Sequence, residues 1–247
     1  MGRTIVVTSG KGGTGKTTAS AAISSFLTAG GSRVLCIDAD AGLKNLDLCL
    51  GLSDRAMLDY GDVLAGRCRL DEAVLPHPDI PGLFFLTAPV VAAEDGEGTK
   101  GFEAMVRFAA GHFDYCIIDS PAGLGPGFRA AVSAADSAII LAVQDPSSRR
   151  DSARVVMELG ALGVRDIRLI VNRVRRSVFS RSKLTIDDVI DSVGAQLLGV
   201  VPEDENVAIA AAREIPLFLY GEPGRAALAF MRIARRIKGE KVPLEIK

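Results

Sequence analysis

The sequence lacks the marks of a secreted, membrane-spanning or disulfide-stabilised protein. Its first residues enter an apolar strand-like run directly, so we expect no signal peptide. No apolar run approaches the roughly 20 residues that a membrane span needs. The four cysteines show no paired spacing, a pattern typical of reduced, mostly buried thiols in a cytosolic protein. Repeats, low-complexity tracts and a Pro/Gly/Ser linker are also missing, which favours a single folded unit.

An excess of charge of one sign is missing as well. The 29 Lys and Arg residues against 30 Asp and Glu leave a formal net charge of −1. Overall charge therefore gives no reason to expect binding to nucleic acid or to an anionic membrane, and any such binding must come from a local patch. Hydrophobic residues at 48% and charged residues at 24% are globular values, so we expect a sizeable core.

Strand-like and helix-like stretches alternate along the chain. The expected strands cover residues 3–8, 33–37, 83–86, 115–118, 137–143, 167–171 and 197–201. The expected helices cover residues 19–29, 53–66, 70–75, 101–110, 148–162, 186–193, 206–213 and 224–238. Continuously apolar strands separated by helices indicate right-handed βαβ units. The pattern predicts one α/β domain over residues 1–238, with a doubly wound, mostly parallel sheet covered by helices on both faces.

The most informative stretch, which we call the phosphate loop, runs from Ser9 to Thr18. It reads Ser-Gly-Lys-Gly-Gly-Thr-Gly-Lys-Thr-Thr between the first expected strand and helix. Glycines let successive N–H groups point at one anion, and the helix N-terminus adds partial positive charge. Lys16 can reach the β- and γ-phosphates, and the Thr17 hydroxyl can ligate Mg²⁺. We therefore predict an ATP–Mg²⁺ site whose loop residues are Gly10, Lys11, Gly12, Gly13, Thr14, Gly15, Lys16, Thr17 and Thr18.

Acidic side chains follow two of the expected strands. Asp38 and Asp40 come after the second strand, and Asp119 ends the fourth. Ligands of a doubly wound sheet bind at the carboxyl ends of its strands, where these acids would meet the phosphate loop. Each acid alone could be a helix cap or a turn residue. Together with the loop, they predict a magnesium shell formed by Thr17, Asp38, Asp40 and Asp119.

A second lysine in the loop points to one family. An ordinary phosphate loop needs a single lysine, but Lys11 begins this one. The spacing resembles the variant loop, Lys-Gly-Gly-x-Gly-Lys-Thr-Thr, of the MinD/ParA family of ATPases. The resemblance implies that Lys11 crosses a dimer interface to the nucleotide of the other subunit, while Lys16 acts within its own subunit. If the resemblance is left aside, Lys11 is a surface lysine that only raises the local electrostatic potential.

Other segments extend the resemblance from residue 3 to about residue 242. Residues 38–51 resemble the family's first switch, which implies that Asp40 activates the attacking water and that Asn45 belongs to the closed switch. Residues 119–123 resemble the second switch, and residues 144–154, with Asp151, resemble the start of the dimer-interface helix. The remaining matches are family segments that hold adenine, and their residues here are Asn172, Pro202, Glu203 and Asp204. The Asn172 side chain can form hydrogen bonds with the base, and Pro202 can pack on its ring.

The resemblance implies a slow, partner-stimulated ATPase that works as a dimerisation switch. The branch of the family that residues 38–51 resemble selects the bacterial division site with a MinC-like inhibitor and a topological factor such as MinE. Residues 239–247 resemble the linker to a membrane-targeting helix that is absent here, so we expect a cytoplasmic protein that can bind the inner face of the cell membrane as a peripheral protein. Two alternatives stay open: a flagellar-number regulator, and a ParA-like DNA-partitioning ATPase using Arg173, Arg175, Arg176, Arg181 and Lys183.

Overall fold

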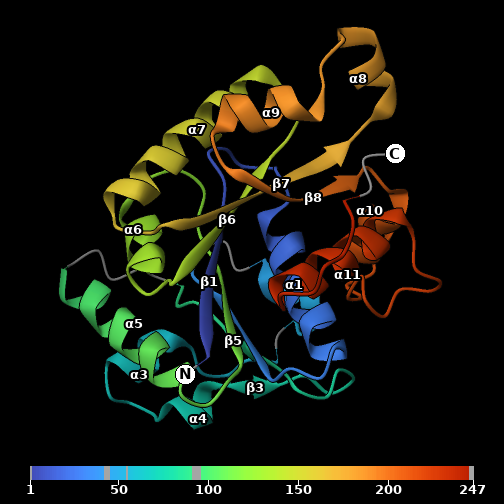
Figure 1. The fold of residues 1–247 in the computed structure, drawn as a ribbon. Helices are drawn as coiled ribbons and strands as arrows, with labels where there is room; N and C mark the ends of the chain where they lie inside the picture. Colours follow the sequence, from blue (N-terminus) through green and yellow to red (C-terminus); the bar gives the residue numbers. More distant parts are fainter. Residues whose placement is uncertain (1, 42–44, 54, 91–95, 245–247) are drawn as a thin grey trace.

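The computed structural model describes residues 2–41, 45–53, 55–90 and 96–244. Within them, the strands form one eight-stranded sheet in the order β3-β4-β2-β5-β1-β6-β7-β8 (Figure 1). Only the short β3 runs antiparallel to its neighbour. The strands are β1 (Arg3–Thr8), β2 (Val34–Asp38), β3 (Leu75–Pro76), β4 (Leu83–Leu86), β5 (Tyr115–Asp119), β6 (Ser137–Ala142), β7 (Asp166–Val174) and β8 (Gln196–Pro202).

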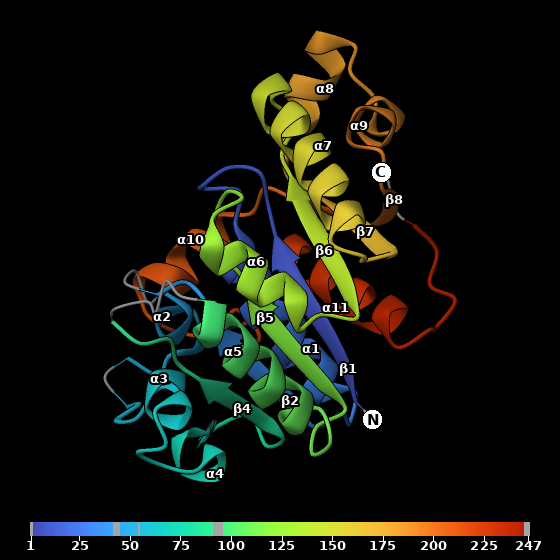
Figure 2. The same ribbon diagram turned by 90° about the vertical axis from the view of Figure 1, so that its left-hand side faces the viewer.

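Helices cover both faces of this sheet, as the turned view makes clear (Figure 2). One face carries α5 (Gly96–Ala109), α6 (Pro126–Ser133), α7 (Pro146–Ala161) and α9 (Ile186–Val193). The other carries α1 (Lys16–Ala29), α2 (Leu46–Leu50), α10 (Glu205–Ala212) and α11 (Arg225–Ile237). The short helices are α3 (Tyr60–Leu64), α4 (Leu70–Ala73) and α8 (Arg176–Ser182), of which α8 projects from the body. The predicted doubly wound α/β sheet is confirmed.

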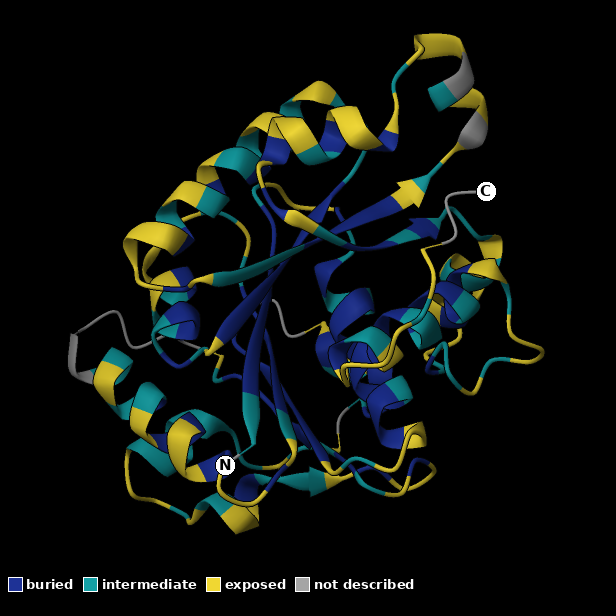
Figure 3. Cartoon of the chain, viewed as in Figure 1, coloured by how far each residue is buried: buried dark blue, intermediate teal, exposed yellow. Residues whose placement is uncertain are grey.

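The core has two layers because successive strand residues point to opposite faces of the sheet. Along β1, Val6 packs on the α5–α7 side, whereas Ile5 and Val7 pack on the α1–α11 side. The central strands are buried on both faces, and the outer helices such as α5 and α7 are exposed on the side away from the sheet (Figure 3). This double burial explains why the strands are continuously apolar in sequence.

The last helix, α11, is part of the core. Phe230, Ile233 and Ile237 are buried against the sheet, while Arg235 is exposed. Within the described residues, no helix combines the length and apolar character needed to cross a membrane.

Several short elements differ from the sequence-based expectation. The helix expected over residues 53–66 forms only at α3, where Asp59 and Asp62 make a reciprocal capping box. The helix expected over 70–75 stops at Ala73, and Leu75 joins β3. The helices α2, α6 and α8 are not among the expected elements. The first has only five residues, too few to show a period.

Candidate nucleotide-binding site

The phosphate loop connects β1, in the middle of the sheet, to the buried helix α1. Gly13 and Gly15 have φ values of 77° and 91°, in the left-handed region that favours glycine. A Cβ on Gly10 would lie 2.4 Å from the carbonyl carbon of Asp151, so only glycine allows this approach to α7. Lys16 is only 8% exposed, whereas Lys11 is exposed. The loop therefore holds one lysine inside the site and presents the other outward.

The acids predicted at the strand ends do meet at one edge of the sheet. In the parallel register, Asp119 of β5 lies beside both Val7 of β1 and Asp38 of β2. Asp119 accepts a hydrogen bond of 2.9 Å from the Ser20 hydroxyl of α1. Asp38 accepts the backbone N–H groups of Asp40 at 2.9 Å and of Leu46 at 3.4 Å. Asp38 therefore ties the switch segment to the sheet.

Burial changes the proton affinity of these carboxyl groups. It raises the pKa of Asp38 to about 7, an effect reinforced by the nearby charge of Asp119. Burial also raises the pKa of Asp119 to about 6, although hydrogen bonds from Thr17 and Ser20 oppose the shift. The pKa of the half-buried Asp40 is raised by burial too, against the opposing charge of Lys16. A divalent cation at this edge would relieve the cost of placing these charges together.

The donor set at this edge suits Mg²⁺, which prefers oxygen ligands. In the described part of the chain, no three His, Cys, Asp or Glu side chains converge into a metal site of their own. The ion would instead be held by the Thr17 hydroxyl together with phosphate oxygens and water. Both oxygens of Asp38 already accept backbone N–H groups, so this residue suits an orienting role better than direct ligation.

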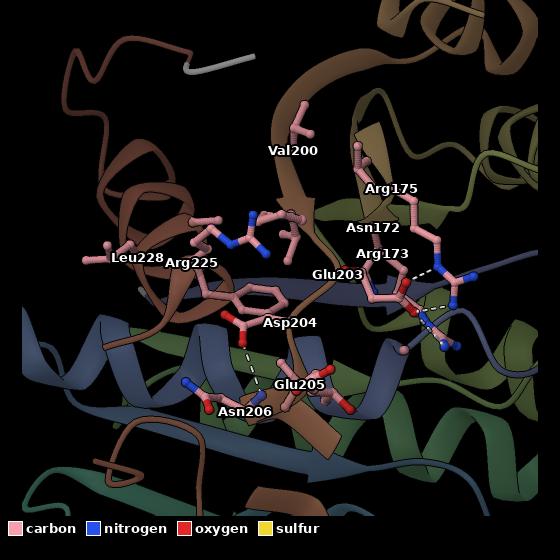
Figure 4. Close-up of a pocket in the computed structure, with 18 of the residues that line it drawn as sticks. Asn172, Arg173, Arg175, Val200, Glu203, Asp204, Glu205, Asn206, Arg225 and Leu228 are labelled. Atoms are coloured by element: carbon pink, nitrogen blue, oxygen red, sulfur yellow. Dashed lines mark hydrogen bonds and ion pairs between the residues drawn. The ribbon is translucent and has the colours of Figure 1, made fainter. Parts of the chain in front are cut away.

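A cavity of about 1700 Å³ opens beside the phosphate loop, between the ends of β7 and β8 and the helix α11 (Figure 4). All four residues expected at adenine line it: Asn172, Pro202, Glu203 and Asp204. Asn172 is buried, and its Nδ2 donates a hydrogen bond of 2.7 Å to the Thr14 carbonyl. The same amide explains Gly15, because a Cβ there would lie 2.6 Å from Nδ2.

The two acids of this cavity also have structural partners. Glu203 accepts hydrogen bonds from the guanidinium groups of Arg173 and Arg175. Asp204 accepts the N–H of Asn206 at the start of α10 and the N–H of Ala226 in α11. The turn after β8 is thus held from both sides, which fixes the wall against which a base could lie.

The residues expected at a dimer interface lie apart from this cavity. Lys11 Nζ is 3.1 Å from Ser147 Oγ and 4.0 Å from Asp145 Oδ1, at the start of α7. Asp145 caps the N-terminus of α7 by accepting a hydrogen bond from the backbone N–H of Ser148. Asp151 lies one helical turn further along α7, and Asn45 is exposed before α2. Residues 42–44 of the expected first switch lie outside the described residues.

Sequence reasoning missed several residues that complete the site. Ser20 is one helical turn after Lys16, a spacing that could have placed it on the face toward Asp119. Arg173 follows Asn172 directly, yet its contact with the loop depends on a left-handed backbone, with φ 53°, that no pattern signals. Ser147 pairs with Lys11 over a separation of 136 residues, which only the fold brings together.

Comparison with known proteins agrees with this geometry. Residues 5–217 match the family model described as the CobQ/CobB/MinD/ParA nucleotide-binding domain. The chain belongs to this family. Over 98% of its length it is 39% identical to a septum site-determining protein MinD from Synechocystis, covering 92% of that protein. It is also 38% identical to MinD from Bacillus subtilis, over 100% of this chain and 92% of the relative.

Solved structures give the same result. MinD from Aquifex aeolicus matches with a TM-score of 0.88 and 37% identity, covering 98% of this chain and 99% of that one. MinD from Pyrococcus horikoshii, solved with Mg-ADP, matches with a TM-score of 0.85 and 30% identity over 98% of this chain and all of that one. These findings confirm the family, the fold class and the interpretation as a MinD-like, nucleotide-binding protein.

Proposed function

We propose that the chain is an ATP-driven dimerisation switch that positions the bacterial division site. The observation that carries the proposal is the pair of loop lysines, with Lys16 buried in the site and Lys11 exposed at its edge. One lysine serves the nucleotide of its own subunit. The other, Lys11, is exposed at the surface and can reach a second subunit. MinD relatives similar over almost the whole chain support this assignment.

The residues of the site divide the work in this proposal. The N–H groups of the phosphate loop and Lys16 bind the phosphates. Thr17, hydrogen-bonded to Asp119, would hold Mg²⁺ together with phosphate oxygens and water, and the ion would supply positive charge beside the phosphoryl group. Asp40 orients the attacking water. Asn172 and Pro202 contact the base. Because Asp38 bonds the N–H groups of Asp40 and Leu46, a change at the phosphates can reach the switch segment through the backbone.

Partners and location follow from the same resemblance. A solved relative, similar to this chain at 37% identity with a TM-score of 0.90, is a MinC:MinD cell division protein complex from Aquifex aeolicus. We propose a MinC-like inhibitor and a topological factor such as MinE as partners of the ATP-bound dimer. The inner face of the cytoplasmic membrane is the proposed site of action, with the tail after residue 238 leading toward it.

The dimerisation step is tested by light scattering of the purified chain with ATP and with ADP. We expect the wild type to dimerise only with ATP. Lys11→Ala should bind ATP but stay monomeric. Lys100→Ala, which removes an exposed lysine from α5, is the matched control and should dimerise normally. Dimers of Lys11→Ala that equal the wild type would overturn the role of Lys11 across the interface.

The cellular role is tested by sedimentation of the ATP-bound chain with anionic liposomes and with DNA. Pelleting with liposomes would support the division-site role. Salt-sensitive pelleting with DNA alone would support the ParA-like alternative. The structure lends that alternative less support, because Glu203 pairs with both Arg173 and Arg175 and so lowers the net positive charge of the expected DNA-binding patch. A ParA family ATPase from Chlorobium tepidum matches at 18% identity, a likeness that shows the fold alone.

A further inference from the structure

We propose that Arg173 is a positioning residue for the phosphate loop. With Asn172, it holds two consecutive loop carbonyls so that the N–H groups of the same peptides face the phosphates. The inference rests on the proposed binding of ATP by this loop. It explains what keeps the backbone of the loop in the conformation that binds phosphates.

Two neighbouring side chains at the end of β7 grip two neighbouring carbonyls of the loop. Asn172 Nδ2 donates to the Thr14 carbonyl at 2.7 Å, and Arg173 Nη1 donates to the Gly13 carbonyl at 3.3 Å. Thr14 and Asn172 are both buried. A third carbonyl, that of Lys11, accepts the Ser9 hydroxyl at 2.7 Å. Carbonyls along the loop are thus held by side chains rather than by a regular helix or strand.

The geometry of the peptide group turns this grip into a phosphate site. In a planar trans peptide, the C=O and the N–H point in opposite directions. Fixing the Gly13 carbonyl therefore fixes the N–H of Thr14, and fixing the Thr14 carbonyl fixes the N–H of Gly15. Because Gly13 and Gly15 have no Cβ, the peptides beside them can rotate at little steric cost. Outside contacts are needed to keep the donors aligned for an anion.

The backbone of Arg173 is shaped for this contact. Its φ of 53° lies in the left-handed region, which is uncommon for a residue with a side chain. The register of β7 against β8 shifts between Val171 and Val174, around this residue. A second guanidinium nitrogen, Nη2, lies 3.3 Å from Glu203 Oε1, which steadies the side chain. Such local strain persists when the surrounding contacts over-determine it.

Arg173 also lines the cavity beside the loop, so a direct contact with the base or sugar is the competing explanation. A ligand with phosphates and no nucleoside separates the two. We would measure the affinities of ATP, ADP and inorganic tripolyphosphate by calorimetry. The test variant is Arg173→Met, which removes the guanidinium and keeps an unbranched side chain. The matched control is Arg175→Met, which removes the same charge and another partner of Glu203.

We expect Arg173→Met to weaken ATP, ADP and tripolyphosphate by one common factor of roughly five to twenty, the usual effect of one hydrogen bond. Arg175→Met should change none of them by as much as twofold. Loss of ATP affinity with unchanged tripolyphosphate affinity would overturn the proposal in favour of a base contact. Equal losses in both variants would show that charge alone acts, and unchanged affinities in Arg173→Met would show no role.

The proposal stays testable if Arg173→Met does not fold. Arg173→Lys keeps the charge but cannot span the Gly13 carbonyl and Glu203 with one planar fork. It should weaken the affinities for ATP, ADP and tripolyphosphate by a common factor smaller than that of Arg173→Met. The melting temperature of the free protein should stay unchanged. Full affinity in Arg173→Lys would again overturn the proposal. Failure of wild-type protein to bind ATP would instead refute the proposed function itself.

Discussion

At the phosphate end of the site, the acids Asp38 and Asp119 are buried side by side, whereas at the base end Glu203 lies near the surface among arginines. Burial raises the pKa of the first two to about 7 and about 6. Hydrogen bonding and the charge of Arg175 hold the pKa of Glu203 below its usual range. The first arrangement is costly without a cation, and the second is satisfied by the protein itself.

The difference indicates what each end is for. Buried carboxyl groups that are unfavourable in the free protein gain most when Mg²⁺ and phosphates arrive, so this end can respond to the nucleotide. The charged groups at the base end already pair with one another, so ligand binding changes their energy little. This end can therefore form a fixed wall of the site. We therefore expect large effects on turnover and binding from the phosphate end and small ones from the base-end ion pairs.

The largest effect is expected at Asp40, which is half-buried next to the paired acids. Among the described residues its carboxylate forms no hydrogen bond, which leaves it available to a water molecule. Asp40→Asn should lower the rate of ATP hydrolysis roughly 10²-fold or more, the usual share of a positioned base, while ATP binding persists. Phosphate release checks the rate. Asp187→Asn, an exposed acid in α9, is the control, and hydrolysis at the wild-type rate in Asp40→Asn would refute the role.

A somewhat smaller effect is expected at Lys16, the buried lysine of the loop. Lys16→Ala removes charge-assisted hydrogen bonds to the phosphates and should weaken ATP by roughly ten- to a hundredfold. Titration with a fluorescent ATP analogue measures the loss, and Lys100→Ala should bind as the wild type does. Affinity retained in Lys16→Ala would mean that the loop N–H groups and the helix terminus suffice to hold the phosphates.

The contrast between the two ends also shows how far the sequence could predict this site. The phosphate loop is contiguous, and its glycine and lysine spacing encodes its own geometry. Asp38 and Asp119 could be placed together because parallel strands end at one edge of a sheet. The expected adenine residues all line the cavity for the same reason.

What the sequence could not predict depends on contacts between distant segments. Asn172 donates to Thr14 across 158 positions, and no local pattern tells that its amide is used by the loop. The second oxygen of Asp38 accepts a hydrogen bond only because α2 folds back and brings the N–H of Leu46 to it. That helix has five residues, too few to show a period. The roles of such residues are set by tertiary structure.

The buried acids should also make stability depend on pH. Asp38 and Asp119 bind protons more tightly in the folded, nucleotide-free protein than in the unfolded chain, whose carboxyl pKa is near 3.8. The folded state then carries more protons, so their contribution to stability falls as pH rises from about 4 to about 7. Melting temperatures across this range should show a negative slope from these groups, and Asp38→Asn should flatten it.

Mg-ATP should oppose this trend, because a divalent cation near these carboxyl groups favours their ionised form over the protonated one. The increase in melting temperature caused by Mg-ATP should be larger at about pH 8 than at about pH 5. The variant Asp187→Asn controls for a general change in surface charge. An increase that is the same at both values would show that Asp38 and Asp119 do not exchange protons for the cation.

The smallest effect is expected from the ion pair of Arg175 with Glu203, which is exposed at the base end. Exposed pairs are screened by water and salt, and ordering two long side chains offsets most of the attraction. Arg175→Met and Glu203→Gln should each lower the melting temperature slightly, and the double variant should lose no more than either. Even this small loss should vanish at high salt. A loss that persists in high salt would mean that the pair behaves as a buried one, and the contrast between the two ends of the site would not hold.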